Sequence, residues 1–118
     1  MKTFNLILTA FAALTMVISC ESKTCENVTN HNYMWFDCEA NYATLSHPDS
    51  IQYYLAKCKD LGFGNVVVDV KSIMGEVLYK SDIAPYMGDW EGVERSLDYD
   101  MLGYFIEYGH EIGLKVFG

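Results

Sequence analysis

The feature that most constrains the fold is a β-branched run in the middle of the chain, Val66-Val67-Val68-Asp69-Val70. Branched side chains favour extended backbone. A strand with one face in water would alternate apolar and polar residues, and this run hardly alternates. Strands covered on both faces belong to parallel sheets, where helical crossovers lie over the sheet. The run therefore predicts a strand of a parallel α/β sheet.

A strand and a helix are expected before this run. Tyr33–Asp37 is aromatic and apolar, which predicts the first strand. Ser46-His47-Pro48-Asp49 has a serine three residues before an acid and a proline in the first turn, a pattern typical of a helix start. Gly62 predicts the helix end. The apolar stripe expected between them consists of Ile51, Tyr54, Leu55, Cys58 and Leu61.

A second helix and a third strand are expected after the run. The helix is predicted over residues 98–112, with Gly113 at its end, and the strand over Leu114–Phe117. The apolar face of this helix contains Leu102, Phe105, Ile106 and Gly109. The order strand, helix, strand, helix, strand predicts parallel strands joined by right-handed crossovers.

The segment Lys71–Leu97 between the second strand and the second helix is too long for a plain connection, so a functional loop is expected. It is rich in acidic and aromatic residues, which can form one wall of a binding cleft or be solvated decoration of a loop. These residues are Glu76, Tyr79, Asp82, Tyr86, Asp89, Trp90 and Glu91.

The N-terminus predicts export and lipidation. Residues 1–19 have a basic start and an apolar run, as in a signal peptide. Val17-Ile18-Ser19-Cys20 is similar to a bacterial lipobox, in which Cys20 is lipidated and becomes the mature terminus; an ordinary signal peptide is the alternative. The polar residues 20–32 are then a tether, and residues 33–118 form the folded part. The expected location is the cell envelope, at the outer membrane or its periplasmic face, with the membrane as a partner.

Charge and cysteine content exclude some classes of function. The net charge of −8 provides no basic surface for nucleic acid. The remaining cysteines, Cys25, Cys38 and Cys58, have no metal-binding spacing, so neither a metal nor a cofactor is predicted. Cys38 and Cys58 lie in apolar patterns and are interpreted as small buried hydrophobic residues.

Three stretches carry a resemblance to a known family: Trp35-Phe36-Asp37, Gly62–Lys71 with the following Gly75–Ser81, and Asp98–Val116. They resemble the glycosyl-hydrolase-like barrels related to family ten, of the alpha-amylase-like type found in Bacteroidetes lipoproteins. The chain departs from that pattern at two strand ends, with Lys71 where arginine is expected and Phe117 where tryptophan or histidine is expected. The resemblance implies the N-terminal part of a TIM (β/α)8 barrel, incomplete, with about three strands and two helices.

The resemblance also implies a function. It implies a glycoside hydrolase-like lipoprotein acting on carbohydrate, with a non-catalytic glycan-binding lipoprotein as the alternative. The catalytic carboxyl pair is expected beyond Gly118, so the chain is expected to be truncated and inactive alone. A flavodoxin-like sheet has the same element order, and the lack of a glycine-rich phosphate turn after the first strand counts against it.

Barrel enzymes carry their sites at the carboxyl ends of the strands. Candidate substrate-binding residues there are Trp35, Asp37, Glu39, Asp69, Lys71 and Glu76. Each has a structural alternative. Asp69 and Lys71 can form a buried ion pair, Asp37 and Glu39 can cap a loop, and Trp35 can pack in the core.

Overall fold

A three-stranded parallel sheet forms the centre of the fold. The computed structural model describes residues 32–118. Its sheet contains β1 (Tyr33–Phe36), β2 (Asn65–Val68) and β5 (Lys115–Phe117), in the order β1-β2-β5. Trp35 pairs with Val67, and Val67 pairs with Phe117. The parallel α/β class, with the valine run in the central strand, is therefore confirmed.

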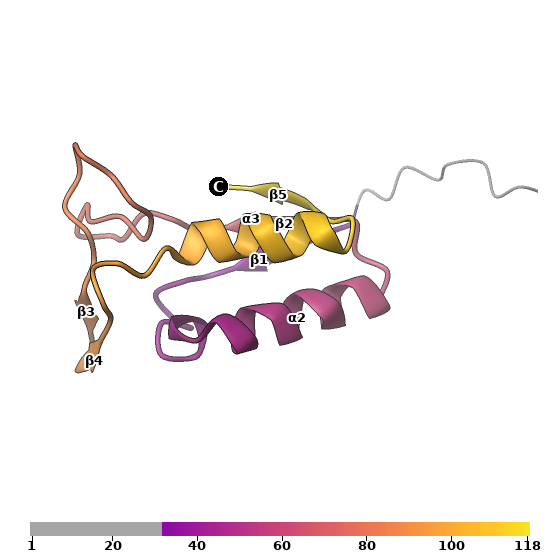
Figure 1. The fold of residues 1–118 in the computed structure, drawn as a ribbon, viewed down its shortest axis with the longest axis horizontal. Coiled ribbons are helices and arrows are strands. Elements are labelled where there is room, and N and C mark those ends of the chain that lie inside the picture. Colours follow the sequence, from indigo (N-terminus) through magenta and orange to yellow (C-terminus); the bar gives the residue numbers. More distant parts are fainter. Residues whose placement is uncertain (1–31) are drawn as a thin grey trace, which may run out of the picture.

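Helices α2 (Pro48–Asp60) and α3 (Met101–Glu111) lie side by side over the sheet (Figure 1). Phe36 of β1 contacts Phe105 of α3 edge to face, with ring centroids 4.9 Å apart. Val66, Val68 and Leu55 of α2 belong to the same buried cluster. Alternate residues of a strand point to the same face, so both helices cover one face of the sheet. Neither helix of this part of the chain has the length and apolar character needed to span a membrane.

The buried stripe of α2 is narrower than expected. Ile51, Leu55 and Cys58 are buried, whereas Tyr54 and Leu61 are 42% and 73% exposed. Residues three and four apart share one side of a helix, and only that side faces the sheet and α3. The helix ends as expected just before Gly62, which adopts a left-handed backbone with φ of 86°.

The helix starts differ from the expectation. His47 is the N-cap of α2, and no side chain caps this end of the helix. The hydroxyl of Ser46, the expected cap, instead donates to the Tyr42 carbonyl at 2.7 Å. Helix α3 begins at Met101, not at Asp98, because the Asp100 carboxylate accepts the Gly103 N–H at 2.9 Å and caps the helix there.

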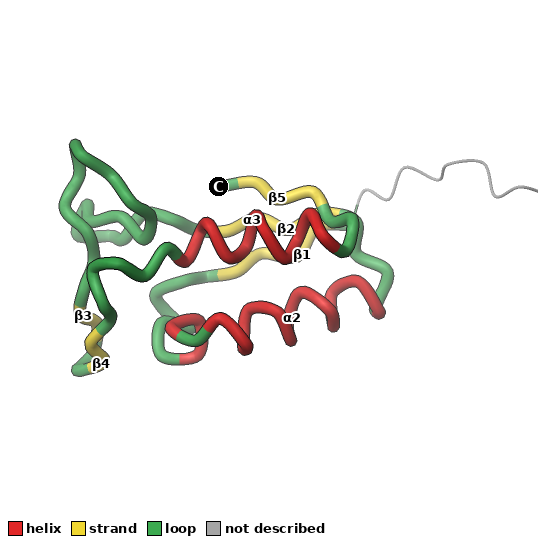
Figure 2. The backbone as a smooth tube through the Cα atoms, viewed as in Figure 1, coloured by secondary structure: helices red, strands yellow, loops and turns green. Residues whose placement is uncertain are grey.

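The long loop contains a hairpin that the sequence did not predict. Strands β3 (Asp89–Trp90) and β4 (Val93–Glu94) pair antiparallel around Glu91 and Gly92, whose φ angles are 50° and 80°. Positive φ at both central residues is typical of a tight hairpin turn. Figure 2 shows this hairpin and the loops at one end of the sheet, near the short 3-10 helix η1 (Thr44–Ser46).

The second face of the sheet has no helix over it in the described part of the chain. Tyr33, Trp35 and Phe117 are 54%, 63% and 45% exposed there, and Val67 beside them is half-buried. The expectation that the central strand is covered on both faces is therefore wrong for residues 32–118. The valine run is apolar on both faces, although the described elements cover only one of them.

Candidate functional site

The carboxyl ends of β1 and β2 lie next to each other. The Asp69 N–H, just after β2, donates to the carbonyl of Phe36, the last residue of β1, at 3.0 Å. Further along the loop, the Ile73 N–H donates to Oε1 of Glu39 at 2.6 Å. The turns after the two strands are thus joined, and this edge of the sheet is the candidate site.

The acidic candidates at this edge bond mainly to nearby backbone. Asp37 Oδ1 accepts the Ala40 N–H at 2.9 Å, and Asp69 Oδ1 accepts the Lys71 N–H at 3.4 Å. The Asp69 carboxylate therefore contacts Lys71 through the backbone rather than through the ammonium group. The Asp37 and Glu39 contacts match the loop-capping interpretation.

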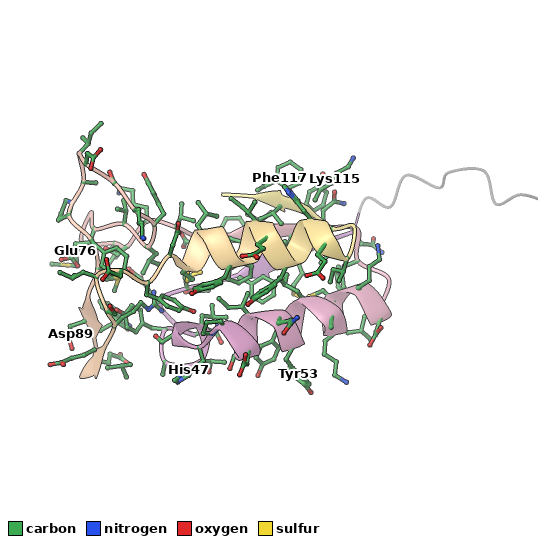
Figure 3. The ribbon with its side chains drawn as sticks, viewed as in Figure 1. His47, Tyr53, Glu76, Asp89, Lys115 and Phe117 are labelled. Atoms are coloured by element: carbon green, nitrogen blue, oxygen red, sulfur yellow. The ribbon has the colours of Figure 1, made fainter. Side chains whose placement is uncertain are left out.

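The other two candidates, Glu76 and Trp35, take no part in the hydrogen bonds that join these two turns. The Glu76 backbone N–H donates to the Ser72 hydroxyl at 3.1 Å, and Figure 3 shows the residue in the long loop beyond the sheet. Trp35 is 63% exposed, so the interpretation of Trp35 as a core residue is wrong. It lines a groove of about 190 Å³ at the β1 edge, together with Tyr54 and Leu45.

Arg95 is a central residue of this region that the sequence analysis missed. Its side chain is 6% exposed, and its Nε donates to the Ser46 hydroxyl at 3.0 Å. A second nitrogen donates to the Tyr42 carbonyl at 3.0 Å, and a third lies 3.8 Å from the Met101 sulfur. The guanidinium thus connects the long loop to the connection between β1 and α2.

Tyrosines complete the attachment of the loop. The Arg95 guanidinium lies 3.8 Å from the centre of the Tyr42 ring and 5.1 Å from that of Tyr99. The Tyr42 hydroxyl donates to the Met87 carbonyl at 2.9 Å, and the Tyr99 hydroxyl donates to the Leu45 carbonyl at 2.7 Å. Burial is the main cause that raises the pKa of the Tyr99 hydroxyl, which therefore stays protonated and able to donate.

Cys38, just after β1, is buried and is a free thiol, as is Cys58 in α2. Burial, followed by the negative charge of Asp69, raises the pKa of the Cys38 thiol to about 12. A thiol with such a pKa is protonated near neutral pH and is a poor nucleophile. Both cysteines are small buried hydrophobic residues, as expected.

The contacts at this edge of the sheet indicate a structural role for its side chains rather than a catalytic one. Its carboxylates hold loop N–H groups, its thiol is protonated, and its buried guanidinium holds carbonyl and hydroxyl groups. Within residues 32–118, no cluster of three or more histidine, cysteine, aspartate or glutamate side chains is arranged to hold a metal ion. The edge fixes the long loop on the sheet.

Comparison with known proteins gives one distant similarity. Over 89 residues the chain is 33% identical to a protein from Niallia circulans described as an S-layer-related protein. The match covers 70% of this chain, which spans about 6% of the length of that relative. No family model matches the chain.

These findings overturn the family and function inferred from the sequence. The assignment to the glycosyl-hydrolase-like barrels of family ten is wrong, because no family model matches and the relative carries a different description. The expected action on carbohydrate, by hydrolysis or by binding, is wrong on the same grounds. The resembling stretches consist of strands, helix ends and glycine turns, which many parallel α/β proteins need for folding alone.

Proposed function

We propose that this chain is a lipid-anchored cell-surface protein whose folded residues form the first part of a parallel (β/α) barrel and serve in surface assembly. In this proposal residues 1–19 are a signal peptide, residues 20–32 are a tether, and residues 33–118 are the barrel portion. The predictions for residues 1–31, including those for Cys20 and Cys25, lie outside the described residues. The description of the relative as S-layer-related supports a surface location.

The observation that carries this proposal is the one-sided sheet. Both crossovers, from β1 to β2 and from β2 to β5, add a strand in the same direction and place their helices on the same face. A barrel is built by repeating this step, with its second face turned inward. A doubly wound sheet reverses direction and covers both faces. The exposed aromatic residues on the second face favour the barrel.

The proposed assembly role rests on the same face, which the described residues leave uncovered. Tyr33 and Phe117 contact each other, with ring centroids 5.9 Å apart, and Trp35 lies on the same side. Exposed aromatic groups of this kind mark surfaces that other polypeptide covers. We therefore expect further strands to cover this face in the assembled protein.

The lipid anchor is tested by Cys20→Ser in the full chain. We expect the parent protein to incorporate labelled palmitate and to fractionate with membranes, whereas the variant is unlabelled and leaves the membrane fraction. Cys25→Ser is the matched control, because it changes a cysteine in the same polar segment, and it should behave like the parent. Palmitate labelling that persists in Cys20→Ser would count against the anchor.

The assembly role is tested by thiol accessibility on the sheet face, in a Cys25→Ser background. In Trp35→Cys, we expect the new thiol to react with a polar maleimide in the purified chain and to be protected in intact cells. Ile83→Cys is the control, because Ile83 is 98% exposed in the long loop, and its thiol should react in both samples. Equal labelling of position 35 in cells and in the purified chain would reject a covered sheet face.

A further inference from the structure

A groove lies between α2 and α3, lined by residues of both helices. Its volume is about 380 Å³. The residues that line it are Asp49, Gln52, Tyr53, Ala56, Tyr108, Glu111 and Ile112. They combine two aromatic rings and two apolar side chains with two carboxylates. Figure 3 shows Tyr53 projecting from α2 away from the sheet, so the groove opens to the outside of the layer.

The lining of the groove carries two carboxylates and no positively charged side chain. Residues 32–118 contain 14 carboxylate side chains against six lysine and arginine side chains. Asp49 and Glu111 are both exposed. Partial burial and the nearby negative charges, including Asp49 and Glu111, raise the pKa of the Tyr108 hydroxyl. The groove therefore favours a positively charged occupant.

Tyrosine rings in this molecule already bind cations. The Arg95 guanidinium lies over Tyr42, and the Lys57 ammonium lies 5.5 Å from the centre of the Tyr53 ring. Along α3, Tyr104 stacks on Tyr108 with ring centroids 6.0 Å apart, which extends the aromatic surface beyond the groove. Aromatic faces beside carboxylates attract ammonium and guanidinium groups.

We propose that the α2–α3 groove binds a basic peptide segment of a partner protein, through its lysine or arginine side chains. The aliphatic stem of such a side chain packs on Ala56 and Ile112 while its charged end reaches a carboxylate. A bare metal cation has no stem to use this apolar lining. Gln52 offers an amide that can pair with a peptide backbone, which a polyamine lacks. This inference goes beyond the proposed function and does not depend on it.

Calorimetric titration of the full chain tests the inference. The protein is prepared as the Cys20→Ser variant, so that it carries no lipid. The probes are an alternating lysine–alanine octapeptide, its glutamate–alanine counterpart and spermidine. We expect the basic octapeptide to bind and the acidic one not to bind. Removing both groove charges, in Asp49→Asn with Glu111→Gln, should weaken binding about tenfold or more. Tyr108→Leu should weaken it about threefold or more through loss of the ring.

The matched control removes the same charge elsewhere. Asp82→Asn with Glu91→Gln changes two exposed carboxylates of the long loop and should leave the affinity within about twofold. Lys57→Gln should strengthen binding, because it removes the cation that now lies over Tyr53. The inference is overturned if the control pair weakens binding as much as the groove pair, since net charge alone would then explain the attraction. Spermidine binding as tightly as the octapeptide, with the same dependence on the groove pair, would also overturn the peptide assignment.

Discussion

Replacing Arg95 by alanine is expected to lower the free energy of unfolding by about 3 kcal/mol. The guanidinium is buried, bonds to the Tyr42 carbonyl and the Ser46 hydroxyl, and lies over the Tyr42 and Tyr99 rings. Alanine would leave the carbonyl without this donor and would open a cavity between two rings. Urea unfolding of the full chain, followed by circular dichroism, measures the loss as a lower midpoint at an unchanged slope.

Lys80→Ala is the control for this change. It also removes a positive charge from the long loop, and Lys80 is exposed, so its effect should stay within about 0.5 kcal/mol. The urea midpoint of Arg95→Lys should fall between those of the parent and of Arg95→Ala. An ammonium group keeps the positive charge but lacks the planar set of donors of a guanidinium. Equal midpoints for Arg95→Ala and Lys80→Ala would show that the loop does not depend on the buried guanidinium.

The second large effect is expected at Phe105, whose replacement by alanine should cost about 3 to 5 kcal/mol. This side chain is fully buried between α3 and the sheet and contacts Phe36 edge to face. Truncation removes both the buried apolar area and the ring contact. The same urea unfolding experiment measures the change.

Ile106→Ala is the neighbouring control. Ile106 is 40% exposed, so we expect a loss below about 1 kcal/mol. If Phe105→Ala and Ile106→Ala lowered stability equally, the core would not lie between α3 and the sheet as described.

The sequence predicted the parts of the fold that short-range patterns determine. The run Val66–Val70 predicts a strand because a short, continuous run of β-branched residues is typical of a buried strand. Gly62 predicts the end of α2 because its left-handed backbone suits glycine. The start of α3 was predicted too early, because Asp98 and Asp100 are both residues that suit an N-cap and only the structure shows that the Asp100 carboxylate caps the helix.

The candidate site was less predictable, because its contacts join distant segments. Glu39 is bonded by Ile73, a residue 34 positions further along the chain. Arg95 lies among polar loop residues, so its sequence neighbours suggest a solvated side chain. Only the packing of η1 and two tyrosines against the loop encloses it. The hairpin turn at Glu91-Gly92 is also unusual, because asparagine or aspartate normally precedes the glycine of such a turn.

The attachment of the long loop has a consequence for local unfolding. The bonds from Tyr99 and Arg95 reach Leu45 and Tyr42, more than 50 residues earlier in the chain. Detaching the loop would expose the buried guanidinium's partners and the interior beneath η1 together. The loop and the connection between β1 and α2 therefore open as one cooperative unit. We expect their amide hydrogens to exchange with solvent in a single event, unlike those of an ordinary surface loop, which exchange residue by residue.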